Sequence, residues 1–84
     1  MAKVDVTIYS RPDCHLCDEA KVAIQAADCA GEYTLNQVNI EEDPTLLERY
    51  KNDIPVIIIN GVEAFRHRLR SDEFRQRILD ARQK

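Results

Sequence analysis

The feature that most constrains this chain is a change of periodicity on either side of two cysteines, Cys14 and Cys17. Before them, apolar residues alternate with polar ones, as in a half-buried strand. After them, apolar residues recur at helical spacing. The apolar positions of the first pattern are Val4, Val6 and Ile8, and those of the second are Leu16, Ala20, Ile24 and Ala27. The sequence therefore predicts a strand that leads, through a short break, into a helix with both cysteines at its start.

A cysteine at the start of a helix has a distinctive chemical environment. The first turn of a helix carries backbone N–H groups without intrahelical partners, and the helix dipole is positive at that end. Both effects stabilise a thiolate, which is the reactive form of cysteine. The position of Cys14 therefore predicts a reactive-thiol site.

The rest of the first half contains one further strand and a short helix. We expect Gly31 to end the first helix and residues 33–40 to form the second strand. Asp43 followed by Pro44 is typical of a helix start, with an acid at the N-cap and proline at the first helical position. The apolar residues expected to face inward are Leu35 and Val38 in this strand, and Leu46, Leu47 and Tyr50 in this helix.

The second half contains a hairpin and a final helix. The unbroken apolar run at residues 56–59 indicates a central strand covered on both faces. Asn60 and Gly61 form a strong two-residue turn signal, because both turn positions need positive φ. Residues 62–65 should then pair back as the fourth strand, and we expect Ser71 to cap the last helix. The inward-facing residues of that helix are expected to be Phe74, Ile78 and Leu79.

The predicted order is β-α-β-α-β-β-α, which places the chain in the α/β class. The first β-α-β unit needs a crossover and therefore parallel strands, whereas the hairpin adds an antiparallel pair. The result is a four-stranded mixed sheet flanked by helices. Cys14 then lies beyond the carboxyl end of the first strand, where open α/β sheets usually place their sites. A length of 84 residues predicts one domain spanning residues 1–84.

Composition and charge argue against several classes of function. The longest apolar run is too short to cross a membrane, and the strand pattern starts too early for a signal peptide. An odd number of cysteines, three, favours a reducing cytoplasm over a secreted disulfide scaffold. The net charge of −3 disfavours nucleic-acid binding, which depends on phosphate contacts.

The charge is unevenly distributed along the chain. Residues 1–65 hold five Lys or Arg and twelve Asp or Glu, whereas residues 66–84 hold seven and three. The basic C-terminal segment could attract an acidic partner or a ligand with a carboxylate. The alternative is an ordinary solvated helix face with surface ion pairs.

The chain resembles the glutaredoxin-like branch of the thioredoxin superfamily over nearly its whole length. The resemblance is carried by three segments, Tyr9-Ser10-Arg11-Pro12-Asp13-Cys14-His15-Leu16-Cys17-Asp18-Glu19-Ala20, Asn39-Ile40-Glu41-Glu42-Asp43-Pro44 and Ile54-Pro55-Val56. It implies a thioredoxin-like fold. It also implies a cis peptide bond before Pro55, beside the cysteine pair, with the backbone of Ile54 free to pair with an extended substrate segment.

The resemblance implies a division of labour between the two cysteines. Cys14 is the candidate nucleophile that attacks a disulfide, and Cys17 is the candidate resolving thiol that breaks the resulting mixed disulfide. The alternatives are half of a zinc site or a pair of inert core thiols. A zinc site usually needs a second cysteine or histidine pair, and only Cys29 and His67 could supply it, so we expect no metal at this site.

The charges around Cys14 act in opposite directions. Two basic groups would stabilise its thiolate and three acids would oppose it. The basic groups are Arg11 and His15, and the acids are Asp13, Asp18 and Glu19. Reactive cysteines of this kind have pKa values of about 3.5 to 7.5, against about 8.5 for free cysteine. We expect the pKa of Cys14 in the upper part of that range. Arg11 and His15 are also candidate substrate-binding residues, together with Ile54 and Pro55.

Two departures from the classical glutaredoxins concern glutathione. Those proteins carry a Gly-Gly turn and an acidic residue after the fourth strand, whereas this chain has Ala64-Phe65-Arg66-His67-Arg68. The proline and tyrosine of the usual active-site motif are replaced by His15 and Leu16. Both changes weaken the case for glutathione binding but leave the disulfide chemistry of the two cysteines intact.

Three further positions have less specific interpretations. Cys29 is expected to be a small buried hydrophobe, with a regulatory or glutathionylated thiol as the alternative. Arg66, Arg68 and Arg70 would point the same way if the fourth strand continued through them. They would then bind a carboxylate or an acidic partner, or form a charged edge that discourages aggregation.

The sequence thus predicts a small monomeric thiol–disulfide oxidoreductase of cell redox homeostasis without a bound cofactor. Its substrate would be a disulfide-containing protein or a small-molecule thiol compound, and its electron donor a reductase or glutathione. Two alternatives stay open. One is a thioredoxin-like binding module in which the cysteine pair is only a redox switch. The other is a glutathione-assisted carrier of a metal or an iron–sulfur cluster.

Overall fold

Strands and helices alternate in the order predicted from the sequence. The computed structural model describes residues 3–27 and 30–82. Its elements are β1 (Val4–Ser10), α1 (His15–Ala26), β2 (Tyr33–Asn39), α2 (Pro44–Tyr50), β3 (Val56–Ile59), β4 (Val62–Arg66) and α3 (Ser71–Arg82), with short 3-10 turns at Ala30–Glu32 and Ile40–Glu42. The predicted α/β class and order of elements are confirmed.

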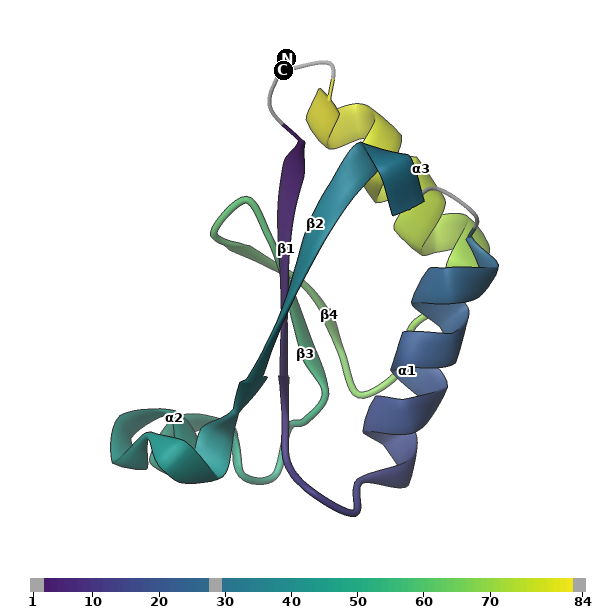
Figure 1. Cartoon of the computed structure of the whole chain (residues 1–84). Coiled ribbons are helices and arrows are strands. Elements are labelled where there is room, and N and C mark those ends of the chain that lie inside the picture. Colours follow the sequence, from purple (N-terminus) through teal and green to yellow (C-terminus); the bar gives the residue numbers. More distant parts are fainter. Residues whose placement is uncertain (1–2, 28–29, 83–84) are drawn as a thin grey trace.

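The four strands form one mixed sheet in the order β2-β1-β3-β4 (Figure 1). β1 is parallel to β2 and antiparallel to β3, and β3 is antiparallel to β4. Val56, the first residue of β3, lies opposite Tyr9 of β1 on one side and opposite Arg66 of β4 on the other. The end of β1, the start of β3 and the end of β4 therefore meet at one edge of the sheet, which we name the site edge.

The main hydrophobic core lies between the sheet and the helices α1 and α3, which Figure 1 shows on the same side of the sheet. The alternation in β1 turns one set of side chains to this side, and the helical spacing in α1 and α3 turns the facing set toward them. The buried members of this core are Val4, Val6, Ile8, Ala20, Ile24, Ala27, Tyr33, Ile57, Ile59, Phe74 and Ile78.

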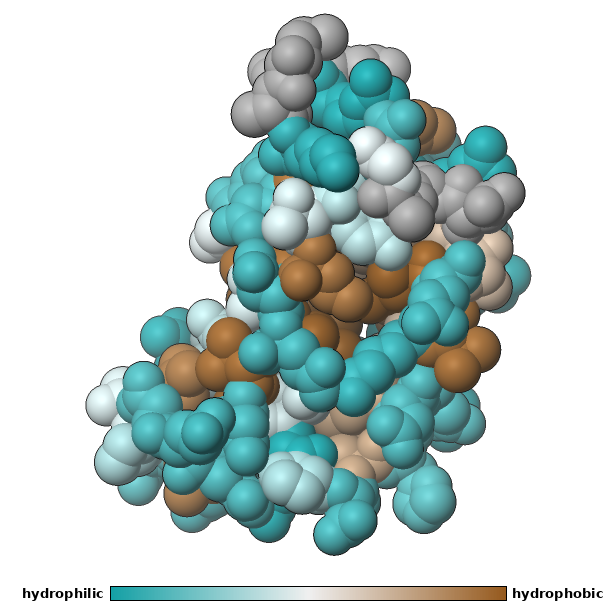
Figure 2. All heavy atoms as spheres, viewed as in Figure 1, coloured by the Kyte–Doolittle hydropathy of each residue, from teal (hydrophilic) through white to brown (hydrophobic). Residues whose placement is uncertain are grey.

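A second, smaller core joins α2 to the rest of the fold. Ile40, Tyr50 and Val56 are buried in it, and the rings of Tyr9 and Tyr50 lie 5.2 Å apart between centroids. Figure 2 shows apolar surface at two places, between β2 and the two long helices and beside α2. α2 is thus anchored next to the site edge, because Tyr9 and Val56 both belong to that edge.

The predicted helix start and hairpin turn are both present. The carboxylate of Asp43 accepts hydrogen bonds from the backbone N–H groups of Thr45 at 2.9 Å and Leu46 at 3.3 Å, as an N-cap does. Asn60 and Gly61 have φ values of 50° and 81°, the left-handed conformation that a tight two-residue turn requires.

Two apolar residues expected to face inward are exposed. Leu35 is 41% exposed because β2 is an edge strand, of which Tyr33 is the buried residue. Leu79 is 36% exposed. It follows Ile78 by one residue, which places it about 100° around the helix from the stripe that Phe74 and Ile78 bury.

Two expected helix boundaries are also displaced. α1 ends at a C-cap formed by Ala27, whose N–H bonds back into the last turn, so Gly31 does not stop the helix. Ser71 is the first residue of α3 rather than its cap. The carbonyl of Arg70 accepts a hydrogen bond from Phe74 N–H at 2.9 Å, which gives Arg70 the capping position.

The expected row of arginines beyond the fourth strand is not formed. β4 ends at Arg66, and His67 has a φ of 70°, which turns the chain out of the strand. Arg66, Arg68 and Arg70 therefore lack the alternation that would align them. Arg66 is also paired with Asp53 and Glu63, and Arg70 is paired with Asp72.

The end of β4 is tied to the segment that precedes β3. The carboxylate of Asp53 lies 3.2 Å from His67 Nε2 and 3.5 Å from Arg66 Nη1. The backbone N–H of His67 donates to the carbonyl of Pro55 at 2.8 Å. We name this set of contacts the β4 tether. It holds two loops of the site edge together.

Arg66 is shared between the tether and a second acid. Its Nη2 and Nε donate to the carboxylate of Glu63 at 2.7 and 3.1 Å. This hydrogen bonding lowers the pKa of Glu63, and the bond from Glu63 in turn raises the pKa of Arg66. The charged forms of both groups are therefore favoured in the folded protein.

Replacing Phe74 should test the main core. Its side chain is fully buried and meets the ring of Tyr33 edge-on at 5.4 Å. Because Phe→Ala in a core removes apolar burial and leaves a cavity, we expect Phe74→Ala to lower the free energy of unfolding by about 3–5 kcal/mol. Urea unfolding followed by circular dichroism measures this. The neighbouring exposed residue provides the control, since Arg75→Ala should change stability by less than about 0.5 kcal/mol. Equal losses in both variants would contradict the packing described.

Replacing Glu63 should test the pair that it forms with Arg66. The pKa of Glu63 is lowered on folding. Its ionised form therefore stabilises the folded state at pH values above the ordinary carboxyl pKa of about 4. This contribution is lost as the pH falls through the lowered value. We therefore expect Glu63→Gln to unfold at lower urea concentration than the native chain at pH 7, with a difference that disappears in acid. Glu48→Gln, an exposed acid on α2, should show no such pH dependence. A difference that persists undiminished in acid would contradict the assignment.

Candidate redox site

The loop between β1 and α1 places Cys14 at the first turn of the helix. Asp13 has a φ of 61°, a left-handed conformation that aspartate tolerates better than most residues. This turn ends the strand direction and lets Cys14 adopt the N-cap position of α1. The carbonyl of Cys14 accepts the first helical hydrogen bond, from Asp18 N–H at 3.1 Å. The strand-to-helix junction predicted from the sequence is confirmed.

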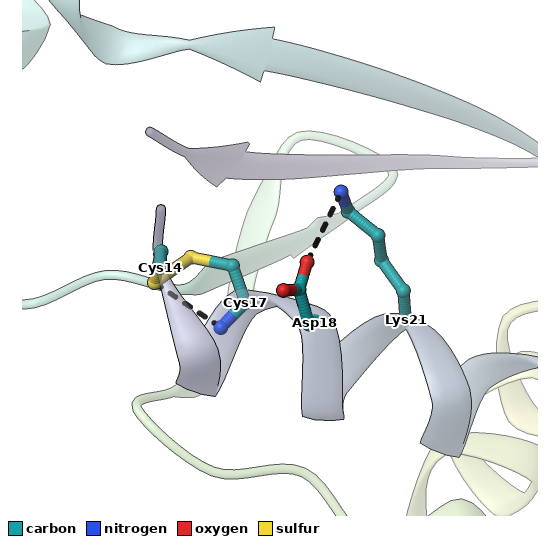
Figure 3. The surroundings of a disulfide bond; sticks show 4 residues. All are labelled: Cys14, Cys17, Asp18 and Lys21. Carbon is teal, nitrogen blue, oxygen red and sulfur yellow. Dashed lines mark hydrogen bonds and ion pairs between the residues drawn. A yellow bond between two sulfur atoms is a disulfide. The ribbon is translucent and has the colours of Figure 1, made fainter. Parts of the chain in front are cut away.

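Cys14 and Cys17 are joined by a disulfide (Figure 3). Their Cα atoms are 5.2 Å apart, within the range that a disulfide spans without movement of the backbone. The backbone N–H of Cys17 points at Cys14 Sγ at 3.2 Å. After reduction, the same N–H is placed to donate to a thiolate on Cys14, and charge-assisted bonds of this kind are stronger than neutral ones.

The two sulfurs differ in their access to solvent. Cys17 is 1% exposed, because it lies on the inner face of α1. Cys14 is partly exposed at the end of the helix. A molecule in solution can therefore reach Cys14, whereas Cys17 is reached only by Cys14 itself. This asymmetry allows the pair to exchange between a disulfide and a dithiol with one external partner at a time.

The charged neighbours of the pair have partners of their own. Arg11 Nη2 lies 3.1 Å from Glu41 Oε2, so its guanidinium is shared with an acid. Asp18 forms a looser pair with Lys21 at 3.9 Å, which Figure 3 shows on the flank of α1. His15 is exposed and lies with Asp18 at a shallow depression on the outer side of α1. Of the two basic groups that the sequence analysis placed near the thiolate, Arg11 is thus partly neutralised.

Ile54 and Pro55 lie at the same edge of the sheet as the cysteine pair. The peptide bond between them is cis, and Pro55 is fully buried. They immediately precede Val56, which pairs with Tyr9 five residues before Cys14. The β4 tether holds this segment through Asp53 and the Pro55 carbonyl. Ile54 and Pro55 therefore lie at the site edge, to which the loop carrying Cys14 also belongs.

The loop between β4 and α3 contributes to the site as one wall of a groove, not as the row of arginines that the sequence analysis considered. Residues 67–70 face the first two turns of α1 across a groove of about 270 Å³. The side of α1 that lines it consists of Leu16, Glu19 and Ala20. Leu16 lies between the two cysteines in the sequence, so the groove follows the helix whose start carries them. No contiguous motif predicts this groove, because residues 16–20 and 67–70 are far apart in the sequence.

Residues 3–27 and 30–82 were considered for a metal site and for a membrane-spanning helix as well. Those residues contain no cluster of three or more His, Cys, Asp or Glu that could hold a metal ion. None of the helices in the same ranges is long and apolar enough to cross a membrane. Cys29, expected as a buried hydrophobe, lies outside the described residues.

Comparisons with known proteins agree with this geometry. The family model described as "Glutaredoxin-like domain (DUF836)" matches residues 5–79. The glutaredoxin-like protein YDR286C homolog of Dictyostelium discoideum is 28% identical over 76 residues, which cover 83% of this chain and 70% of that protein.

Solved structures show the same fold. The X-ray structure of protein XcR50 from X. campestris is 30% identical and has a TM-score of 0.75, over 90% of this chain and 96% of that one. Chloroplastic thioredoxin z is similar in fold alone, with a TM-score of 0.77 at 12% identity over 98% of this chain and 80% of the other. The family match, the shared fold and the bonded cysteine pair together support a role in thiol redox chemistry. The chain belongs to the glutaredoxin-like family.

Proposed function

We propose that this protein is a thiol–disulfide oxidoreductase in which Cys14 is the nucleophile and Cys17 the resolving thiol. The observation that carries the proposal is the unequal exposure of two bonded sulfurs at the start of one helix. The exposed sulfur lies at the positive end of α1 and faces an N–H donor, which favours the thiolate. The buried sulfur is protected from external disulfides and available to its neighbour.

The reaction balances with the two cysteines alone. The Cys14 thiolate attacks one sulfur of a substrate disulfide, which forms a mixed disulfide and releases the other substrate sulfur as a thiolate. Cys17 then gives up its proton and attacks Cys14 Sγ. The second substrate sulfur leaves as a thiolate, and the Cys14–Cys17 disulfide is formed. The substrate has gained two electrons, both from the dithiol, so no bound cofactor is needed.

The site edge also suggests how the substrate is held. The backbone of Ile54 beside the cis peptide bond to Pro55 can pair with an extended segment of a substrate, as a strand added to a sheet edge does. Arg11 and His15 are exposed and lie within three residues of Cys14 in the sequence. They would contact the parts of the substrate next to the reacting sulfur.

The wider setting is part of the same proposal. The substrate is a disulfide-containing protein or a small thiol compound, and a reductase or glutathione returns the electrons. The protein works as a monomer in the cytoplasm and contributes to cell redox homeostasis. A reducing compartment fits this cycle, because it supplies the thiols that reset the Cys14–Cys17 disulfide.

Trapping the mixed disulfide should test the roles of the two cysteines. Cys17→Ser removes the resolving thiol, so we expect Cys14 to accumulate as a mixed disulfide with a disulfide substrate, detected as added mass on the intact protein. Cys14→Ser should form no such adduct at this site, because the buried Cys17 cannot be reached. Both variants carry Cys29→Ser so that the third cysteine does not contribute.

Turnover separates the proposed enzyme from a redox switch. Disulfide reduction is measured with glutathione and its reductase, and separately with thioredoxin reductase. We expect turnover with at least one of these donors, and its loss in Cys14→Ser. If Cys14 is readily oxidised but neither donor supports turnover, the pair is a switch on a binding module and the proposed activity is wrong.

The pH dependence of Cys14 alkylation should test the charge balance around it. We expect a midpoint in the upper part of the range of about 3.5–7.5 that reactive cysteines span, and a value below about 5 would contradict this. Asp13→Asn should lower the midpoint, because it removes a negative charge beside the thiolate and keeps a side chain that tolerates positive φ. Glu48→Gln on α2 is the matched control and should leave the midpoint unchanged.

A further inference from the structure

The groove between α1 and the loop at residues 67–70 is lined by both apolar and charged side chains, and the charged ones are called its rim. We name it the 67–70 groove; it is lined by Leu16, Glu19, Ala20, His67, Arg68, Leu69 and Arg70. Leu16, Ala20 and Leu69 supply the apolar part. In Figure 1 the loop that carries residues 67–70 runs from β4 past α1 before α3 begins. The groove therefore lies along the first two turns of α1, the helix that carries the cysteine pair at its start.

The rim contains one cation without a partner. Arg70 Nε lies 3.3 Å from Asp72, and His67 Nε2 lies 3.2 Å from Asp53. Arg68 is exposed, and its guanidinium has no hydrogen bond or ion pair within residues 3–27 and 30–82. Glu19, on the α1 side of the groove, is its single acidic lining residue. A ligand that enters past Leu69 therefore meets an unpaired positive charge.

The segment of the chain that supplies most of the groove is rich in basic residues. Residues 66–84 carry seven basic and three acidic residues, whereas residues 1–65 carry five and twelve. The groove takes four of its seven lining residues from the basic segment. A local excess of basic residues attracts an acidic segment to the groove and orients it.

The groove is also connected to the Ile54–Pro55 segment, with which a substrate segment would pair. The backbone N–H of His67 donates to the Pro55 carbonyl at 2.8 Å, so the loop that carries Arg68 and Leu69 begins next to the Ile54–Pro55 segment. A substrate segment paired with Ile54 would then reach the start of this loop. A free small thiol compound would not need both places at once, whereas a protein segment would occupy both.

From these observations, and on the basis of the proposed disulfide exchange, we propose that the 67–70 groove selects protein substrates. It binds an apolar side chain against Leu16 and Leu69, and Arg68 pairs with an Asp or Glu close to the target cysteine. Glu19 limits the number of acids that the groove accepts. Arg68 is thus a specificity-determining residue, while the electron transfer itself stays with Cys14 and Cys17.

Two matched peptides test this proposal. Each carries one cysteine as a mixed disulfide with 2-nitro-5-thiobenzoate and a leucine beside it, followed by two glutamates in one peptide and two lysines in the other. Attack by Cys14 releases the coloured thiolate, and the rate gives kcat/KM for each peptide. We expect the acidic peptide to be favoured by about two- to five-fold at low salt, the range of a single exposed ion pair. High salt should remove the preference.

Variants assign the preference to Arg68. Arg68→Glu should reverse it, and Glu19→Gln should increase it, because one removes the cation and the other the opposing acid. Arg75→Glu is the matched control, since Arg75 is an exposed arginine of α3 outside the groove. Its preference should equal that of the native chain. Circular dichroism of each variant checks that the fold is intact.

The possible failures are distinguishable. If neither peptide releases the thiolate with the native protein, the proposed exchange itself is wrong and the inference falls with it. If both peptides react equally, or if Arg68→Glu leaves the preference unchanged, the exchange stands and the groove assignment is overturned. If Arg68→Glu slows reduction of glutathione disulfide but leaves the peptide preference unchanged, the groove serves a small thiol rather than a protein segment, and the proposal is also overturned.

Discussion

The position of β3 between β1 and β4 is the constraint on which the site depends. β3 is only four residues long, but it is buried on both faces, so a shift by one residue would expose its apolar side chains. Its register is therefore fixed. Through Val56 it brings the end of β1 and the end of β4 to the same edge. The cysteine loop, the Ile54–Pro55 segment and the loop at residues 67–70 follow from those three strand ends.

The helix start adds the chemistry to this frame. A sulfur at the N-cap of α1 receives an N–H from the residue three positions on, and the same helical turn buries that residue's own sulfur. One local conformation thus supplies activation to Cys14 and protection to Cys17. The surrounding acids oppose formation of the Cys14 thiolate, and the pairing of Asp18 with Lys21 reduces this effect. Arg11 would favour the thiolate, but it is shared with Glu41. The backbone contribution is therefore the constant one, and the side-chain charges adjust it.

Much of the fold could be predicted because its signals are local. The alternation in β1, the Asp43–Pro44 helix start and the Asn60–Gly61 turn each depend on a few neighbouring residues, and each is present in the structure. The prediction that Leu35 and Leu79 face inward is wrong because their exposure does not depend on local signals. Their exposure depends on which strand is at the sheet edge and on how α3 is rotated, and both are set by packing between distant segments.

The site divides in the same way. The cysteine pair and the Ile54–Pro55 junction could be predicted because they are contiguous motifs. The β4 tether and the groove could not, because they join residues 53–55 with 66–67 and residues 16–20 with 67–70. The bulge after Ile57 and the left-handed turn at His67 decide where those residues meet, and neither has a strong sequence signal.

The loop after β4 combines a structural task with a chemical one. Other glutaredoxins use a glycine pair at this point, whereas here His67 takes the left-handed turn itself, with its side chain against Asp53. A positive φ is unfavourable for histidine. The backbone hydrogen bond to Pro55 and the contact with Asp53 can offset this free-energy cost. Because His67 is fixed in this way, the next residue, Arg68, is directed to the groove rather than to the tether. The left-handed turn at His67 and the positive charge of Arg68 are thus consecutive features of one loop.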